Sequence, residues 1–136
     1  MRYLAFLTLA ACLLLSSPLR AEEGRDAAVA AATAWLATVD SGAYADSWKE
    51  TSSLFQGAVS QATFSAQLRG VRGPLGAVKS RKLSSATFTT SVPGAPDGKY
   101  WVLQFSTSFE KKASAVETVT PMLDHGKWKV GGYYIR

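Results

Sequence analysis

The first half of the chain carries apolar residues at helical spacing. A series of alanines followed by Trp35, Leu36 and Val39 predicts a helix over residues 23–39 that ends before Gly42. A second helix is predicted from an aromatic stripe at intervals of three and four residues, which we expect to pack in the core. The stripe consists of Tyr44, Trp48, Thr51 and Phe55.

A third helix is predicted after Ser60, whose hydroxyl suits the N-cap position. Phe64, Leu68 and Val71 share one face of this helix, and the Gly-Pro pair that follows ends it. The composition then changes to serine, threonine and valine over residues 78–90. This change predicts a first strand, followed by a segment dense in turn-forming residues.

Apolar and polar residues alternate in the last third of the chain. One face carries Trp101, Leu103, Phe105 and Phe109, and the other carries Tyr100, Gln104, Ser106 and Ser108. A turn over 111–114 leads to a strand over 115–123, and a tight hairpin at 124–127 leads to a strand over 128–135. The order predicts an α+β fold, in which about three N-terminal helices pack on an antiparallel sheet of about four strands.

Residues 1–21 have the pattern of a cleaved secretory signal. A short basic start precedes a run from Leu4 to Leu15 that is apolar apart from Thr8, and Ala21 is small enough for peptidase cleavage. About twelve apolar residues are too few for the roughly 20 that a membrane-spanning helix needs. We therefore predict a periplasmic or secreted product without a transmembrane segment, consisting of a single domain over residues 22–136.

An alternative processing route involves Cys12. The Leu-Ala-Ala-Cys sequence that ends there matches the lipobox of bacterial lipoproteins, whose cysteine is acylated and becomes the first mature residue. Cleavage before Cys12 would leave an apolar segment of about eight residues and place three leucines directly after the anchor, where polar tethers are usual. Cleavage after Ala21 is therefore the favoured prediction, with a lipid-anchored envelope protein as the alternative.

Cleavage after Ala21 removes the single cysteine and two basic residues. The mature chain then has no thiol for a disulfide, a nucleophile or a metal ligand, so its stability has to come from its core. Its net charge falls from +5 to +3, which is mildly basic. Basic residues gather in three small groups, which are Lys79, Arg81 and Lys82, then Lys111 and Lys112, and Arg69 with Arg72. Because these groups lack interleaved aromatics and a nucleic-acid-binding module, we expect no nucleic-acid partner.

The mature chain resembles the bacterial domain of unknown function 4019 over essentially its whole length. The resemblance rests on Trp35-Leu36 with Val39-Asp40, Gly42 and Tyr44, Ser47-Trp48, Arg72 with Pro74-Leu75-Gly76, Ser80-Arg81, Pro96-Asp97-Gly98, Phe109, Glu117-Thr118-Val119, Gly126, Trp128 and Gly132-Tyr133-Tyr134-Ile135. It implies a small exported or envelope protein and supplies no catalytic residues. The order of elements also resembles the nuclear transport factor two-like fold, which implies a strongly curved sheet around a pocket.

Glu117 is the most informative candidate residue, because it lies in the middle of an apolar strand. A carboxylate there has to be paired, hydrogen-bonded or in contact with a cavity. The favoured interpretation is a salt bridge with Arg72 or Arg81, or exposure on the solvated face of the sheet. Asp40, near a helix end, could join such a salt bridge. The alternative interpretation is that Glu117 faces a ligand.

Three aromatic residues could line a ligand pocket with polar groups on an apolar wall: Trp48, Tyr100 and Tyr133. Together with Arg81 and Glu117, they are the candidate ligand-binding residues, although large aromatics in a small domain mostly serve packing. His125 is the only histidine and falls in the hairpin turn, and the acidic residues lack ligand spacing. We therefore expect no catalytic histidine, no metal site and no other cofactor.

These patterns favour a non-enzymatic exported domain that binds a small molecule or an envelope protein, with a homodimer as a further possibility. The alternative is a general acid-base enzyme that uses Glu117 with a tyrosine such as Tyr133. That alternative requires both side chains to converge in a pocket, and it loses its basis if Glu117 is locked to an arginine.

Overall fold

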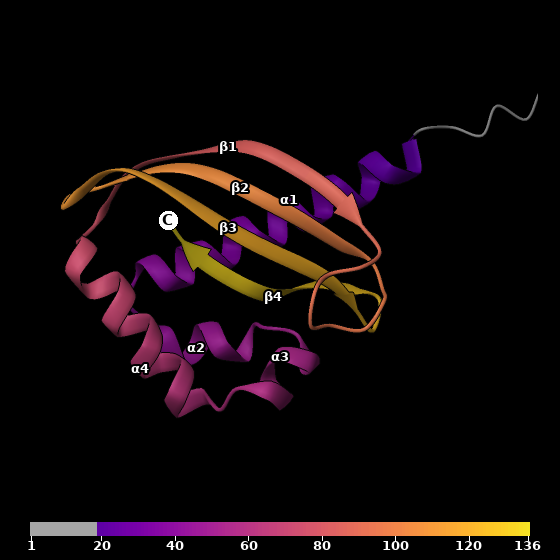
Figure 1. Ribbon diagram of the computed structural model, residues 1–136, viewed down its shortest axis with the longest axis horizontal. Helices are drawn as coiled ribbons and strands as arrows, with labels where there is room; N and C mark the ends of the chain where they lie inside the picture. The colour runs from indigo at the N-terminus through magenta and orange to yellow at the C-terminus, as the bar shows by residue number, and fades with distance from the viewer. Residues whose placement is uncertain (1–18) are drawn as a thin grey trace, which may run out of the picture.

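The computed structural model describes residues 19–136, which form helices followed by one curved antiparallel sheet (Figure 1). The helices are α1 (Leu19–Asp40), α2 (Tyr44–Lys49), α3 (Ser53–Ala58) and α4 (Gln61–Arg72), with the 3-10 turn η1 at Gly73–Leu75. The strands are β1 (Val78–Thr89), β2 (Tyr100–Phe109), β3 (Lys112–Asp124) and β4 (Lys127–Ile135), and they pair in chain order. The predicted α+β fold is confirmed.

Residues 1–18, which include Cys12 and most of the predicted signal, lie outside the described residues. Cleavage after Ala21 and acylation of Cys12 therefore stay predictions. From residue 19 onward, no helix combines the length and the apolarity that crossing a membrane requires.

Helix α1 supplies much of the core by packing against the sheet. Its small alanines let the helix approach the strands closely, and its C-terminal half adds bulky side chains. Ala28, Ala32, Trp35, Leu36 and Val39 are all at most 2% exposed. They belong to one apolar cluster with residues of β2, β3 and β4, namely Trp101, Leu103, Phe105, Val119 and Val130.

The prediction of one continuous second helix is wrong, because the segment forms the two short helices α2 and α3. Between them, Thr51 forms a bridge with Val130 of β4, and the Ser52 N–H donates to the Val130 carbonyl at 2.8 Å. The Ser52 hydroxyl then caps α3 by accepting from the Phe55 N–H. Pairing with β4 thus overrides the helical spacing at Thr51, although the stripe still packs inward.

Helix α4 begins as predicted, with the Ser60 hydroxyl accepting from the Thr63 N–H. Phe64 and Leu68 are buried, whereas Val71, which shares their face of the helix, is 49% exposed. Val71 lies one residue before the end of α4 and lines a groove together with Tyr134 and Ile135 of β4.

The hairpins differ from the prediction at one end only. Strand β3 begins at Lys112, so the turn predicted over 111–114 is shorter, and Phe109 pairs directly with Lys112. The hairpin between β3 and β4 is confirmed, with His125 and Gly126 at φ of 50° and 80°, as a two-residue type I′ turn requires. Asp124 then accepts from the Ser53 N–H at 2.8 Å and hydroxyl at 2.9 Å, which ties this hairpin to α3.

Candidate functional site

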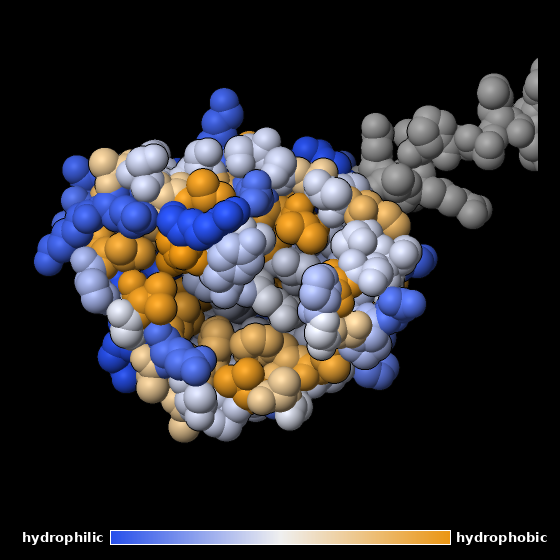
Figure 2. Space-filling model, viewed as in Figure 1, coloured by the Kyte–Doolittle hydropathy of each residue, from blue (hydrophilic) through white to orange (hydrophobic). Residues whose placement is uncertain are grey.

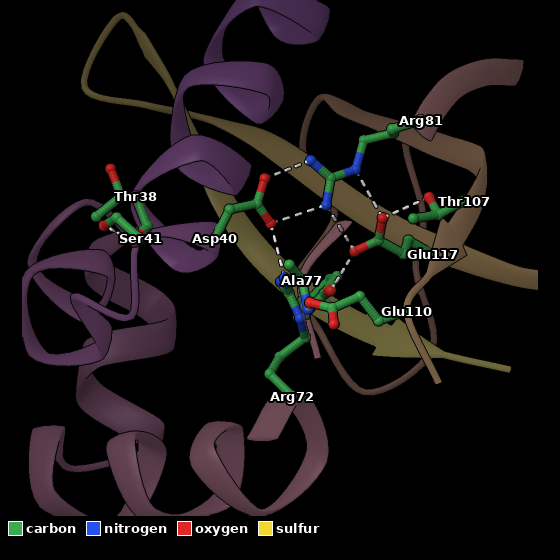
Figure 3. Close-up of polar contacts among 10 residues, drawn as sticks. Thr38, Asp40, Ser41, Arg72, Ala77, Arg81, Thr107, Glu110 and Glu117 are labelled. Atoms are coloured by element: carbon green, nitrogen blue, oxygen red, sulfur yellow. Dashed lines mark hydrogen bonds and ion pairs between the residues drawn. The ribbon is translucent and has the colours of Figure 1, made fainter. Parts of the chain in front are cut away.

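A cluster of charged residues lies between the C-terminal ends of α1 and α4 and the sheet (Figure 3); Glu117 and Arg72 are buried, and Asp40 is partly exposed. At its centre, Glu117 of β3 has no exposed surface. Its carboxylate accepts from Arg81 Nε at 2.7 Å and Nη2 at 3.2 Å, and from the Thr107 hydroxyl at 2.5 Å. The Tyr133 hydroxyl donates to Glu117 Oε2, the same oxygen that accepts from Arg81 Nη2. All sides of this carboxylate are therefore occupied.

Arg81 extends the cluster to Asp40, the last residue of α1. Its Nη1 and Nη2 donate to the two Asp40 oxygens at 2.7 and 3.0 Å, so one guanidinium holds two carboxylates. Arg72, the last residue of α4, donates to Asp40 at 2.8 Å and lies over the Phe109 ring, 5.0 Å from its centroid. Two acids and two arginines thus balance each other in charge and fasten both helix ends to the sheet.

The sheet register brings these residues together. Arg81 of β1 lies opposite Thr107 of β2, and Phe105, two residues before Thr107, lies opposite Glu117 of β3. Thr107 and Glu117 are therefore diagonal neighbours on the sheet face that α1 covers. Of the alternatives for Glu117, the salt bridge with Arg81 is the one that the structure contains.

The cluster shifts the pKa of several of its members, including Asp40 and Tyr133. Burial alone would raise the pKa of Asp40, but the hydrogen bonds and charges of Arg81 and Arg72 hold it below the ordinary value of 3.8. Burial, reinforced by the adjacent Glu117 carboxylate, raises the pKa of Tyr133 above its ordinary value of 10.0. Tyr133 therefore stays protonated, and its hydroxyl donates a hydrogen bond to Glu117.

A groove of about 510 Å³ lies next to this cluster, between α3, α4 and the end of β4. Its lining is Phe55, Val59, Phe64, Gln67, Leu68, Val71, Tyr133, Tyr134 and Ile135, none of which carries a charge. Val71 and Tyr134 are 49% and 52% exposed at its margin. In Figure 2 the molecule is hollowed on this face, and apolar side chains gather around the hollow.

Tyr133 connects the groove to the charged cluster. Its ring lines the groove and meets the Trp35 ring edge-on at a centroid distance of 5.0 Å, while its hydroxyl reaches Glu117. The cluster thus fixes the ring that separates the groove from the buried charges.

The structure brings together three of the five candidate residues, because Arg81 and Glu117 share the cluster with Tyr133. Trp48 lies apart from them, and its Nε1 donates to the carbonyl of Val59 in the groove wall at 2.8 Å. Tyr100 was expected on the polar face of its strand, but it is 3% exposed and donates to the Pro96 carbonyl at 2.5 Å. The loop between β1 and β2 folds back over this tyrosine and buries it.

Sequence reasoning missed Thr107 and most of the groove. Thr107 alternates with Phe105 and Phe109, and this spacing alone would have placed it on the buried face. No such spacing indicates the groove. The apolar residues of α3, α4 and β4 that line it have the same sequence pattern as residues that pack in the core.

Within the described residues, no three histidine, cysteine, aspartate or glutamate side chains are grouped as metal ligands. The His125 side chain is 87% exposed in the hairpin turn, in contact with Asp124. It therefore lies apart from both the charged cluster and the groove.

Comparison with protein families gives one match. The family model described as "Protein of unknown function (DUF4019)" matches residues 31–133, which include the whole charged cluster and most of the groove lining. The chain belongs to this family. No significant match was found among curated proteins or solved structures. The resemblance to the nuclear transport factor two-like fold therefore stays a prediction, and the family itself assigns no activity.

Proposed function

We propose that this protein of the DUF4019 family is a non-enzymatic, exported binding module whose site is the groove between α3, α4 and β4. The observation that carries the proposal is an uncharged cavity of about 510 Å³ with Val71 and Tyr134 exposed at its margin. Ligand sites in proteins typically have 300–1,000 Å³ and mostly apolar walls. Exposed apolar surface that is gathered around a hollow marks an interaction site more often than scattered single residues do.

The charged cluster supports this proposal by holding the groove in shape. Arg72 ties the C-terminal end of α4 to Asp40, and Tyr133 ties β4 to Glu117. The two opposite walls of the groove are therefore anchored to one network of ion pairs and hydrogen bonds. A site that is already formed loses less conformational freedom when its ligand binds, so it binds more tightly.

The same cluster argues against Glu117 as a general base. Glu117 and Tyr133 converge, as the enzyme hypothesis requires, but Arg81 and Thr107 occupy the carboxylate oxygens as well. A general base needs a free lone pair within reach of the proton that it removes. The network instead gives Glu117 a structural role, which favours binding over acid-base catalysis.

Binding of an uncharged apolar fluorophore, N-phenyl-1-naphthylamine, tests the proposal. We expect saturable fluorescence enhancement with the wild-type protein. Val71→Glu should weaken binding about tenfold or more, because it places a carboxylate in the apolar groove. The matched control is Ala66→Glu, which adds the same charge at an exposed position of α4 outside the groove lining and should bind like wild type.

Two results would contradict the proposal. One is the absence of saturable binding by the wild-type protein. The other is equal binding by the Val71→Glu and Ala66→Glu variants, since the bound fluorophore would then lie elsewhere. Both variants should first show wild-type circular dichroism, because their positions are exposed.

A further inference from the structure

The groove follows the free edge of β4. Strand order places β4 at one end of the sheet, where it pairs with β3 alone among the described strands. Tyr133, Tyr134 and Ile135 all line the groove. Because successive side chains of a strand point to opposite faces, three consecutive residues can line one groove only if it runs along the edge of the strand.

The hydrogen-bond pattern shows which backbone groups point into the groove. Val116 of β3 and Arg136 exchange both N–H···O bonds, each at 2.9 Å. Backbone groups in an antiparallel ladder alternate between the partner strand and the opposite side. The N–H and carbonyl of Tyr134 therefore face β3, whereas those of Tyr133 and Ile135 point to the free side.

A bulge in β4 gives this edge two different parts. Val119 lies opposite Tyr133 and Pro121 lies opposite Val130, so β4 has one extra residue at Gly131-Gly132. The extra residue turns the Val130 carbonyl to the free side as well, where it accepts from the Ser52 N–H at 2.8 Å. At Val130, the free edge of β4 is therefore hydrogen-bonded to Ser52. After the bulge, from Tyr133 onward, the same edge borders the groove.

We propose that the groove binds an extended peptide segment that adds to β4 as a fifth strand. This inference rests on the proposed function and names its ligand. The peptide backbone would pair with Tyr133 and Ile135, and its apolar side chains would lie among Phe64, Leu68 and Val71. An acyl chain could fill the same volume, but it would leave the backbone groups of the strand without partners in an apolar site. A peptide strand would give the free backbone groups of β4 hydrogen-bond partners, and its side chains would cover the apolar walls of the groove.

The charges around the groove indicate the kind of peptide. Helices α3 and α4 contain no acidic residue. The Arg136 guanidinium lies 5.8 Å from the centroid of the Tyr134 ring, at the end of the groove formed by β4. We therefore expect apolar residues followed by an acidic side chain or a free carboxylate, because the Arg136 guanidinium would attract an anion at this end of the groove.

Peptide selection followed by backbone methylation tests this inference. A random heptapeptide library is selected against the wild-type protein, with the Val71→Glu variant as the negative control. The enriched peptide is then synthesised in three forms: unmodified, N-methylated at odd positions and N-methylated at even positions. We expect one methylated form to bind at least tenfold more weakly and the other to bind like the unmodified peptide, because only alternate N–H groups face β4.

Amide hydrogen exchange supplies a second readout of strand addition. Binding should slow exchange at Tyr133 and Ile135, and it should leave Tyr134 unchanged because that amide already faces β3. A peptide that binds without any methylation effect and without protection at Tyr133 would occupy the groove but not as a strand, which overturns the inference and leaves the proposed function standing.

The remaining outcomes separate the two proposals. If N-phenyl-1-naphthylamine binds in the groove but no heptapeptide is enriched over the Val71→Glu control, the peptide inference fails alone. The same holds if sodium decanoate binds the groove and no peptide competes with it. If the fluorophore also fails to bind, the proposed function fails with the inference.

Discussion

Replacement of Glu117 by glutamine tests the role of the charged cluster directly. The change keeps the size of the side chain and removes its charge, at a position with no exposed surface. Arg81 loses one of its two carboxylates, and an amide NH₂ replaces an oxygen that accepts hydrogen bonds. Removal of one partner from a buried ion pair costs about 3–5 kcal/mol. Because Arg81 keeps Asp40, we expect a loss of about 3 kcal/mol.

Urea unfolding followed by tryptophan fluorescence and circular dichroism measures this loss. In thermal unfolding of a domain of this size, the same loss of about 3 kcal/mol corresponds to a fall in Tm of roughly 12 °C. Glu50→Gln is the matched control, because Glu50 is exposed and accepts only a 3.3 Å bond from the Thr38 hydroxyl. The control should change stability by less than about 0.5 kcal/mol. If Glu117→Gln behaves like this control, the cluster does not hold the fold together and the reasoning is refuted.

Two further predictions concern acid stability and processing. The lowered pKa of Asp40 means that the unfolded chain binds more protons near and below pH 3.8, so the free energy of unfolding should fall as the pH drops through that range. Asp40→Asn should make this fall shallower in urea unfolding measured from pH 6 to 3, and an unchanged slope would contradict the assignment. Intact mass spectrometry of protein recovered from envelope fractions after expression of the full chain should give a chain that starts at Glu22. A diacylated chain that starts at Cys12 would overturn that processing route.

Much of the fold follows from local patterns in the sequence. The helical spacing that ends at Val39, the N-cap at Ser60 and the turn at His125-Gly126 each have a local physical cause, and each occurs where it was predicted. The salt bridge of Glu117 could also be predicted, because a carboxylate within an apolar strand needs a partner and the chain offers few arginines.

The features that were not predicted depend on contacts between distant segments. Thr51 leaves the helical pattern because β4 pairs with it, and only the folded chain brings Val130 to that position. Val71 shares a helix face with two buried residues, yet it is 49% exposed. The groove is lined by residues of α3, α4 and β4, so no single segment of the sequence could have indicated it.

Methyl NMR during a titration with N-phenyl-1-naphthylamine tests the central claim most directly, because the described residues contain competing apolar sites. A smaller cavity of about 250 Å³ is lined by Leu54 and Met122, among others, and provides methyl groups for comparison. We predict saturable shifts of the Leu68, Val71 and Ile135 methyl signals, with those of Leu54 and Met122 unchanged. Shifts confined to Leu54 and Met122, or no saturable shift in the groove, would contradict the assignment of the groove as the binding site.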